Sequence, residues 1–330
     1  MGTTHMLCIS RSLSFDAAGC DPAIKGKIQP EEVNPMSSFV LSCCSIADTT
    51  PAHLKSRNIP FANFHYIIDG KECIDDMGVS MTMNDFYSAM VAGADAHTAQ
   101  VNVEEYIRFF TPFLEGGLDV LHVALSSGLS GSYNSARIAA EMLSEQFPER
   151  KLYIVDSLAA SSGVGLIMET LADMRDEGMD IDQLYQWIEQ NKKTMHLWFC
   201  STDLTFFVKG GRVTKAAGWF GTVLKICPVL NVDYLGRLIP RFKIRGKQKA
   251  LKELVNQMEE HAQNGLDYNG KCFICQSACM EDAKMVAADI EKRFPKLNGK
   301  VQIFDIGPTI GCHAGPGTTA VFFWGDERTN

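Results

Sequence analysis

The fold is indicated most clearly by residues 121–136, which read LHVALSSGLSGSYNSA. The apolar run over 121–125 predicts a buried strand, and the glycines that follow it predict a turn. Alanine and other apolar residues then recur at helical spacing over 132–147. A strand that leads through a glycine-rich turn into a helix is typical of α/β proteins.

This turn has the composition of an anion-binding site. Gly128 and Gly131 let the backbone approach a ligand closely, and the first turn of a helix presents free N–H groups. Four serine hydroxyls add donors: Ser126, Ser127, Ser130 and Ser132. A phosphate or a carboxylate fits such a turn, and plain capping of the helix by Ser130 or Ser132 is the alternative. The turn lacks the Gly-Lys-Ser/Thr ending of a Walker loop and the Gly-x-Gly-x-x-Gly pattern, so a nucleotide is not indicated.

Strands and helices alternate in the first half of the chain. Strand-like runs cover 39–43, 64–68, 121–125 and 152–155, and helical patterns cover 102–114, 132–147 and 181–193. This alternation predicts a mostly parallel sheet covered by helices on both faces, in a domain over 37–193. Residues 1–36 show no sustained period, which favours a flexible extension or upstream sequence.

Strands follow one another more directly after residue 194. Strand-like runs cover 197–201, 228–232, 238–242, 272–276, 301–305 and 319–324, and helical patterns cover 247–262 and 281–294. The runs on either side of Gly236 predict a hairpin. We therefore expect a second α/β domain with a mixed sheet over 194–330.

Composition excludes several classes of protein. Lys and Arg number 31 against 39 Asp and Glu, and the net charge of −8 argues against a general nucleic-acid binder. The longest apolar runs are strand-sized, which predicts a soluble protein without a membrane span, while transient membrane contact stays open. No secretory signal is evident, and the 11 cysteines are interpreted as reduced thiols, so we expect a cytoplasmic location.

Two further segments have residues suited to binding. Residues 305–318 read DIGPTIGCHAGPGT, and His313 is their one side chain that titrates near neutral pH. This segment is either a shaped ligand loop or a tight turn with an exposed histidine. Residues 207–213 read FVKGGRV and place Arg212 on a glycine-flexed loop, where it contacts a phosphate or a partner protein, or lies in a solvated turn.

The cysteines Cys272, Cys275 and Cys279 have a spacing that invites a metal interpretation. A strand would point Cys272 and Cys275 to opposite faces, and no histidine lies near them, so buried thiols and no metal site are expected. The basic run over 243–252 is interpreted as a solvated helix start, or as an edge that meets an anionic partner.

Taken together, these segments resemble the DegV family of bacterial fatty-acid-binding proteins. The similar motifs are SSGLSGSY (126–133), VDS (155–157), KGGRV (209–213) and GPTIGCHAGPG (307–317), with 221–230 and 243–250 also similar. The chain departs from the family at 42–45, where SCCS replaces Thr-Asp-Ser-Thr, and at 98–101, where TAQV replaces Thr-Ser-Gln-Pro. Both departures are expected near the carboxylate end of the ligand.

The resemblance implies a three-layer α/β/α domain with a parallel sheet, followed by a two-layer α/β domain with a mixed six-stranded sheet. Between them would lie one long-chain fatty acid, with its carboxylate held by Thr98, Ser127 and His313. The turn residues that would support this end are Ser126, Gly128 and Gly131. Candidates for an apolar acyl tunnel are Phe206, Phe207, Trp219, Phe220, Leu224 and Ile226.

By the same resemblance the protein is the lipid-presenting subunit of a bacterial fatty acid kinase. It would have no catalysis of its own and no cofactor, and it would offer the fatty acid to a separate ATP-dependent kinase protein for conversion to acyl-phosphate. Arg212 would lie on the face that meets the kinase. The alternatives are a hydrolase or transferase that uses Ser127 with His313 on an acyl or phosphorylated substrate, and a lipid store or sensor without a kinase.

Overall fold

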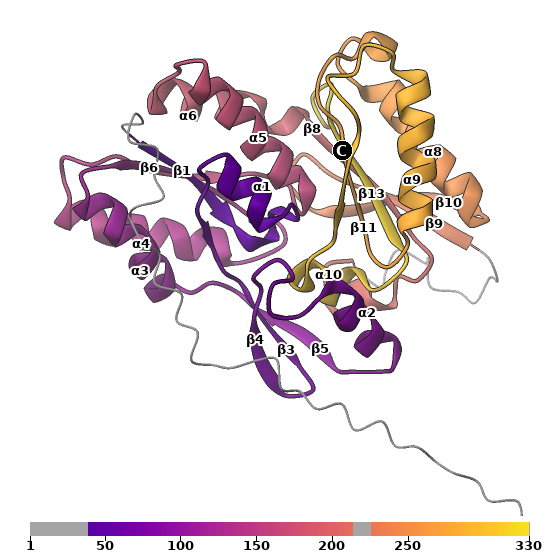
Figure 1. Cartoon of the computed structure of the whole chain (residues 1–330), viewed down its shortest axis with the longest axis horizontal. Coiled ribbons are helices and arrows are strands. Elements are labelled where there is room, and N and C mark those ends of the chain that lie inside the picture. Colours follow the sequence, from indigo (N-terminus) through magenta and orange to yellow (C-terminus); the bar gives the residue numbers. More distant parts are fainter. Residues whose placement is uncertain (1–38, 214–225, 330) are drawn as a thin grey trace, which may run out of the picture.

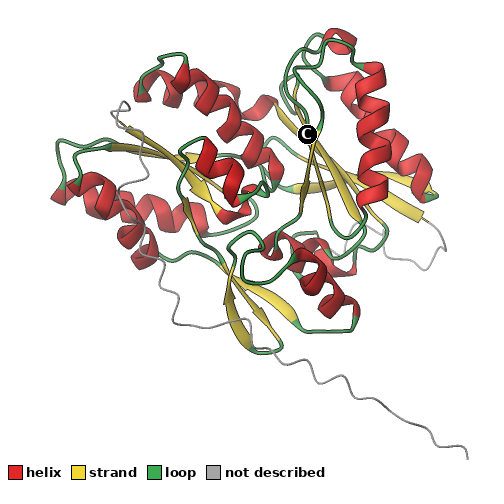
Figure 2. Ribbon diagram, in the orientation of Figure 1, coloured by secondary structure: helices red, strands yellow, loops and turns green. Residues whose placement is uncertain are grey.

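The computed structural model describes residues 39–213 and 226–329 (Figures 1 and 2). The expected extension over 1–36 lies outside these residues. Three sheets are present in the described ranges: a four-stranded, a three-stranded and a six-stranded one. Below, residues 39–194 are called the first part and residues 195–329 the second part.

A parallel sheet of four strands forms the centre of the first part, in the order β2-β1-β6-β7. These strands are β1 (Phe39–Cys44), β2 (Phe61–Ala62), β6 (Asp119–Ala124) and β7 (Leu152–Asp156). Helices α3 (Val103–Glu115) and α4 (Ser132–Gln146) cover one face, and α5 (Ser162–Asp176) and α6 (Ile181–Asn191) cover the other (Figure 1). All six residues of β1 are buried, as two covered faces require. The predicted three-layer arrangement is confirmed.

Helix α3 shows how local sequence sets these layers. Asn102 accepts a hydrogen bond from the backbone N–H of Glu105, and the Glu105 carboxylate accepts one from the N–H of Asn102, which is a capping box. The residues of the helix that are buried beneath this cap are Tyr106, Phe109, Phe110, Phe113 and Leu114. Their spacing produces a single apolar face directed at the sheet.

The prediction for residues 64–68 as a strand of the parallel sheet is wrong. β3 (His65–Ile68) lies in a separate antiparallel sheet with β4 (Lys71–Ile74) and β5 (Ala96–Ala99), in the order β4-β3-β5. Asp69 and Gly70, with φ of 50° and 78°, form a tight turn that reverses the chain. The burial of β3 alternates, since only one face packs against neighbours such as α10 (Pro308–Ala314).

A mixed sheet of six strands forms the second part, in the order β10-β9-β8-β13-β11-β12. Its strands are β8 (Met195–Ser201), β9 (Ile226–Val232), β10 (Leu238–Arg245), β11 (Phe273–Gln276), β12 (Gln302–Asp305) and β13 (Thr318–Trp324). Helices α8 (Lys247–His261) and α9 (Met280–Arg293) cover one face, and the other face turns toward the first part (Figure 1). The expected mixed sheet is confirmed, as is the hairpin at Gly236, where φ is 74°.

Alternate residues of the second sheet pack on its two faces. Phe322 packs with the first part, whereas Phe323 packs under α8 and α9. Cys275 packs with Phe322 on the side of the first part, and Cys272 packs with Phe323 under the helices. Both thiols are free and buried, so the prediction that they face opposite sides of the sheet is confirmed. No helix in the described ranges has the length and apolar character needed to cross a membrane.

The glycine-rich turn after β6 joins the two parts. The Ser126 hydroxyl donates a hydrogen bond of 2.8 Å to the carbonyl oxygen of Gly236 in the β9–β10 hairpin. A Cβ atom on Gly128 would lie 2.7 Å from the carbonyl oxygen of Leu235 and 2.8 Å from that of Gly236. Gly128 is therefore needed for close packing of the two parts.

We predict that Gly128→Ala destabilises the protein. The added methyl group meets two backbone oxygens that cannot turn away, and such overpacking costs about 1–3 kcal/mol. Urea denaturation of the wild type and the variant measures this loss. The control is Ser127→Ala, since the exposed neighbour Ser127 makes no side-chain hydrogen bond within the described residues. Equal stability of Gly128→Ala and the wild type would contradict the packing argument.

Candidate functional site

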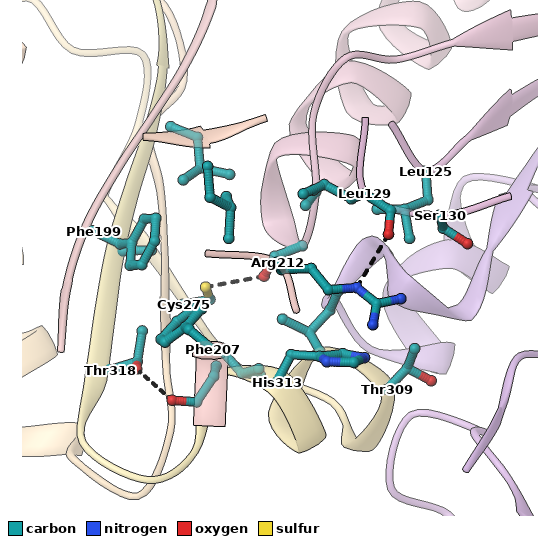
Figure 3. Close-up of a pocket in the computed structure, with 18 of the residues that line it drawn as sticks. Leu125, Leu129, Ser130, Phe199, Phe207, Arg212, Cys275, Thr309, His313 and Thr318 are labelled. Atoms are coloured by element: carbon teal, nitrogen blue, oxygen red, sulfur yellow. Dashed lines mark hydrogen bonds between the residues drawn. The ribbon is translucent and has the colours of Figure 1, made fainter. Parts of the chain in front are cut away.

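A cavity of about 260 Å³ lies between the two parts (Figure 3). Side chains of the parallel-sheet part meet side chains of the six-stranded sheet across it. Its apolar walls come from Phe64, Leu125, Leu129, Leu197, Phe199, Phe207, Leu238, Ile306, Ile310 and Phe322. A cavity with such walls suits an apolar ligand.

Polar side chains gather at one end of the cavity. Thr98 on β5 and His313 on α10 are joined by a hydrogen bond of 2.9 Å between Thr98 Oγ1 and His313 Nε2. Ser130 and Thr309 also line the cavity, as does Arg212. Two of the predicted carboxylate-binding residues, Thr98 and His313, are therefore brought together from segments 215 residues apart.

The imidazole of His313 is neutral at pH 7. Burial lowers its pKa to about 4, and the nearby Arg212 cation acts in the same direction. His313 Nδ1 is buried and has no hydrogen-bond partner among the described residues. In either neutral tautomer, the Thr98–His313 pair keeps one donor hydrogen unused: the Thr98 hydroxyl hydrogen if Nε2 donates, or the Nδ1 hydrogen if Nε2 accepts.

Arg212 lies in the cavity lining at this polar end, and its guanidinium is half-buried. Its Nε donates to the carbonyl oxygen of Leu129 at 3.2 Å (Figure 3). Its Nη1 donates to the carbonyl oxygen of Gly210 at 2.5 Å. Burial lowers the pKa of Arg212, but a guanidinium stays protonated at neutral pH. It therefore supplies a fixed positive charge beside the neutral His313.

Gly210 explains why the 207–213 segment and the 305–318 segment form one site. A Cβ atom on Gly210 would lie 2.2 Å from His313 Nδ1, so only glycine lets the histidine ring pack against this backbone. The tight-turn interpretation of 305–318 is replaced by the short helix α10, which directs His313 into the protein.

Ser127 is not brought to this site. Ser127 is exposed, and its backbone N–H donates a hydrogen bond to Asp156 Oδ1 at 3.0 Å. Ser126 is fully buried against the Gly236 carbonyl, and Gly131 packs on the side chain of Gln100. The turn is shaped by protein contacts, and the hydroxyl that it offers to the cavity is that of Ser130.

Of the predicted acyl-tunnel residues, Phe207 lines the cavity. Phe206 packs beside Gly315 and against a small buried cluster that includes Cys312. Ile226 lies at the start of β9 and does not line the cavity. Trp219, Phe220 and Leu224 lie outside the described residues. Sequence reasoning missed Phe64, which precedes β3, and it missed Phe199, Leu238 and Phe322, although inward-facing strand residues of the six-stranded sheet are the signal that identifies such walls.

One group within the described ranges has the residue types of a metal site: His196, His261 and Asp326. The two imidazole rings are stacked, with centroids 5.0 Å apart and planes 19° from parallel, so their in-plane lone pairs do not converge on one point. Trp198 Nε1 donates to His196 Nδ1 at 3.3 Å, which leaves Nε2 to donate to Asp326. This geometry fits a hydrogen-bonded ring stack better than it fits a metal.

The proposed hydrolytic pair also finds no support in the geometry. No hydrogen bond joins Ser127 and His313 in the described part of the chain. The Thr98–His313 pair would need an orienting carboxylate at His313 Nδ1, and no described side chain occupies that place. The arrangement therefore suits binding of a polar group.

These features define a class of protein in which two α/β parts enclose an apolar cavity with one polar end. The chain belongs to the DegV family, because the family model described as "Uncharacterised protein, DegV family" matches residues 44–326. A DegV domain-containing protein of Clostridium perfringens, CPE0026, is 36% identical over 89% of this chain and 99% of its own length.

Two solved structures share this fold. A DegV lipid-binding protein from Thermotoga maritima is 26% identical, with a TM-score of 0.75 over 88% of this chain and 99% of its own. The Fatty Acid Kinase (Fak) B3 protein of Streptococcus pneumoniae, loaded with linoleic acid, is 22% identical, with a TM-score of 0.76 over 88% of this chain and 100% of its own. The second likeness concerns the fold alone.

We predict that His313 makes the stability of the protein depend on pH. Its pKa is 6.5 when unperturbed and about 4 in the fold, so between these values the unfolded chain binds more protons. This contribution to stability is fully present above pH 6.5 and is lost as the pH falls toward 4. His313→Gln should therefore show a smaller difference in urea midpoint between about pH 7.5 and about pH 5 than the wild type.

The control for this measurement is His97→Gln, which changes an exposed histidine on the same strand as Thr98. It should keep the wild-type difference between the two pH values. A His313→Gln variant with the wild-type difference would show that His313 is not held neutral.

Proposed function

We propose that this protein binds one long-chain fatty acid, with the acyl chain between the apolar walls and the carboxylate at the polar end. The observation that carries the proposal is the unused donor of the Thr98–His313 pair, beside the Arg212 cation, in a cavity whose walls are mostly apolar. A buried polar group without a partner is unfavourable, and a ligand oxygen would satisfy it. The lipid-binding relative of the same family supports this choice of ligand class.

The charge at the polar end fits an anion. Arg212 carries the positive charge, and the Ser130 and Thr309 hydroxyls stand beside it in the lining. Hydrogen bonds to a carboxylate are stronger than those between neutral groups, at about 1.5–3 kcal/mol each. Each buried methylene of the chain adds about 0.8 kcal/mol, so a long chain needs few polar contacts.

We propose further that the bound acid is presented to a separate ATP-dependent kinase and leaves as acyl-phosphate. Support comes from membership of the DegV family and from the shared fold with the Fak B3 protein, which was solved with linoleic acid. No described side chain orients His313 at Nδ1, as the carboxylate of a catalytic triad would, and this favours presentation of the acid over hydrolysis by this chain. Arg212 is the residue that we place at the contact with the kinase.

The binding proposal predicts that a fatty acid leaves with the protein. Native mass spectrometry of the purified chain, followed by denaturing extraction, should give one fatty acid per chain. After removal of lipid, Thr98→Val and Ser130→Ala should each weaken palmitate binding about 3- to 100-fold, the range for one hydrogen bond to a neutral or charged partner. Ser127→Ala is the matched control, because Ser127 lies in the same turn but outside the cavity lining.

Two results would contradict this proposal. An empty protein that also fails to take up added palmitate would exclude fatty-acid binding. If Ser127→Ala loses as much affinity as Ser130→Ala, the carboxylate lies at Ser127 on the outer side of the turn, which is the position expected from the sequence motifs.

The kinase proposal predicts that Arg212→Gln lowers the rate of acyl-phosphate formation per bound lipid by at least about tenfold, as loss of a charged contact would, beyond any loss of lipid from the weaker charge at the polar end. The assay combines lipid-loaded protein, ATP and a fatty acid kinase, and it quantifies bound lipid in the same samples. Lys209→Gln, an exposed cation in the same segment, is the control. Unchanged acyl-phosphate formation per bound lipid would favour a lipid store, and loss of lipid with an unchanged rate per bound lipid would leave Arg212 a role in carboxylate binding alone.

A further inference from the structure

Helix α10, which bears Thr309 and His313, begins without a capping side chain of its own. Its first residue is Pro308, which has no N–H group, and the residue before it is Gly307. Two buried aspartates from other segments satisfy the free N–H groups: Asp48 Oδ1 accepts from the Gly307 N–H at 2.9 Å, and Asp75 Oδ2 accepts from the Thr309 N–H at 3.1 Å. The start of α10 is therefore held from outside the helix.

The two aspartates come from different sheets of the first part. Asp48 ends the short helical turn η2 (Ser45–Ala47) that follows β1 of the parallel sheet. Asp75 directly follows β4 of the three-stranded sheet. Figure 1 shows α10 between the three-stranded sheet and the six-stranded sheet. All three sheets are thus connected through the first turn of this one helix.

Each carboxylate is itself firmly held. The Ser161 hydroxyl donates to Asp48 Oδ2, and the Ser162 hydroxyl donates to the Asp48 carbonyl oxygen at 2.7 Å. The backbone N–H of Met77 donates to Asp75 Oδ1 at 3.2 Å. These bonds use the remaining oxygens of both side chains, so neither carboxylate is free to follow a shift of α10.

Gly307 permits this arrangement. A Cβ atom at this position would lie 2.9 Å from Asp48 Oδ1 and 3.6 Å from Asp75 Oδ1. The two carboxylates therefore both lie close to the same backbone position. Within the described residues, neither carboxylate forms an ion pair with a basic side chain. Burial therefore raises the pKa of Asp75 to about 6, and it raises the pKa of Asp48 well above its usual value.

Thr309 and His313 are four residues apart on α10, so their side chains share one face of the helix. Both line the cavity, which means that this face is the one turned toward the ligand. A rotation or shift of the first turn would move both side chains relative to Thr98 at once. The geometry at the start of α10 therefore sets the geometry at the polar end of the cavity.

We propose that Asp48 and Asp75 are positioning residues that fix α10 and thereby hold His313 and Thr309 in place for the head group of the ligand. This role rests on the proposed fatty-acid binding. It adds that binding of the head group depends on the two aspartates, whereas binding of the acyl chain does not. Loss of either carboxylate should weaken binding through the head group, while the apolar walls continue to hold the chain.

The test compares two ligands of equal chain length, palmitate and hexadecanol, on the full protein after removal of lipid. Asp48→Ala and Asp75→Ala should each lower palmitate affinity by about tenfold and hexadecanol affinity by less than about twofold, because a charged head group depends more strongly on placed donors. The control is Glu72→Ala, which removes an exposed carboxylate from β4.

Conservative variants separate positioning from general damage. Asp48→Asn keeps an oxygen for the Gly307 N–H and offers an amide hydrogen to Ser161, so it should restore palmitate affinity to within about threefold of the wild type. Asp75→Asn has one acceptor oxygen for the two N–H groups that now reach Asp75, so it should fall between Asp75→Ala and the wild type.

A measurement without ligand keeps this inference distinct from the fatty-acid proposal. Proton NMR titration of His313 should show its pKa rise from about 4 toward 6.5 in Asp48→Ala, as the ring loses its buried position, and return in Asp48→Asn. An unchanged His313 titration in both alanine variants overturns the positioning role. Equal loss of palmitate and hexadecanol overturns it too, whereas failure of the wild type to bind palmitate overturns only the proposed function.

Discussion

The hydrogen bond between Thr98 and His313 is the interaction on which the site depends. It joins a strand of the small antiparallel sheet to a helix of the second part, across 215 residues of sequence. Neither residue has this partner unless the parallel sheet, the small sheet and the six-stranded sheet are all in place. The fold thus brings this polar pair into a cavity whose walls are mostly apolar.

The charge at this end of the cavity suits an anionic head group. A neutral His313 and hydroxyl side chains offer hydrogen-bond donors, and Arg212 adds one positive charge that its bonds to Leu129 and Gly210 keep in place. Placed donors of this kind need no reorganisation when the ligand arrives. The high cost of burying Asp48 and Asp75 is understandable in the same terms, because it fixes the donors of α10.

Sequence patterns identified much of this arrangement and missed what depends on long-range packing. The capped helix α3 and the hairpin at Gly236 follow from local rules, and the strand periods are sufficient to predict both larger sheets. The separate sheet of β3 was signalled by Asp69-Gly70 and by alternating burial, yet the general α/β pattern suggested otherwise. Gly128 and Ser126 are residue types that suit an anion-binding turn. Whether such a turn faces a ligand or another part of the backbone depends on segments distant in the sequence, and here it packs against Leu235 and Gly236.

The same reasoning separates the two departures from the family motifs. In the SCCS segment, the Ser42 hydroxyl bonds to His122 Nδ1 at 3.0 Å, and Cys44 Sγ lies 3.1 Å from the hydroxyl of Tyr106. These groups are enclosed in the core beneath α3 and do not line the cavity, so this departure makes no direct contact with the proposed carboxylate end. The TAQV segment is different, because both Thr98 and Gln100 line the cavity. If the proposed head-group site is correct, β5 and the residues that follow it are therefore where this departure from the family can act on the head group.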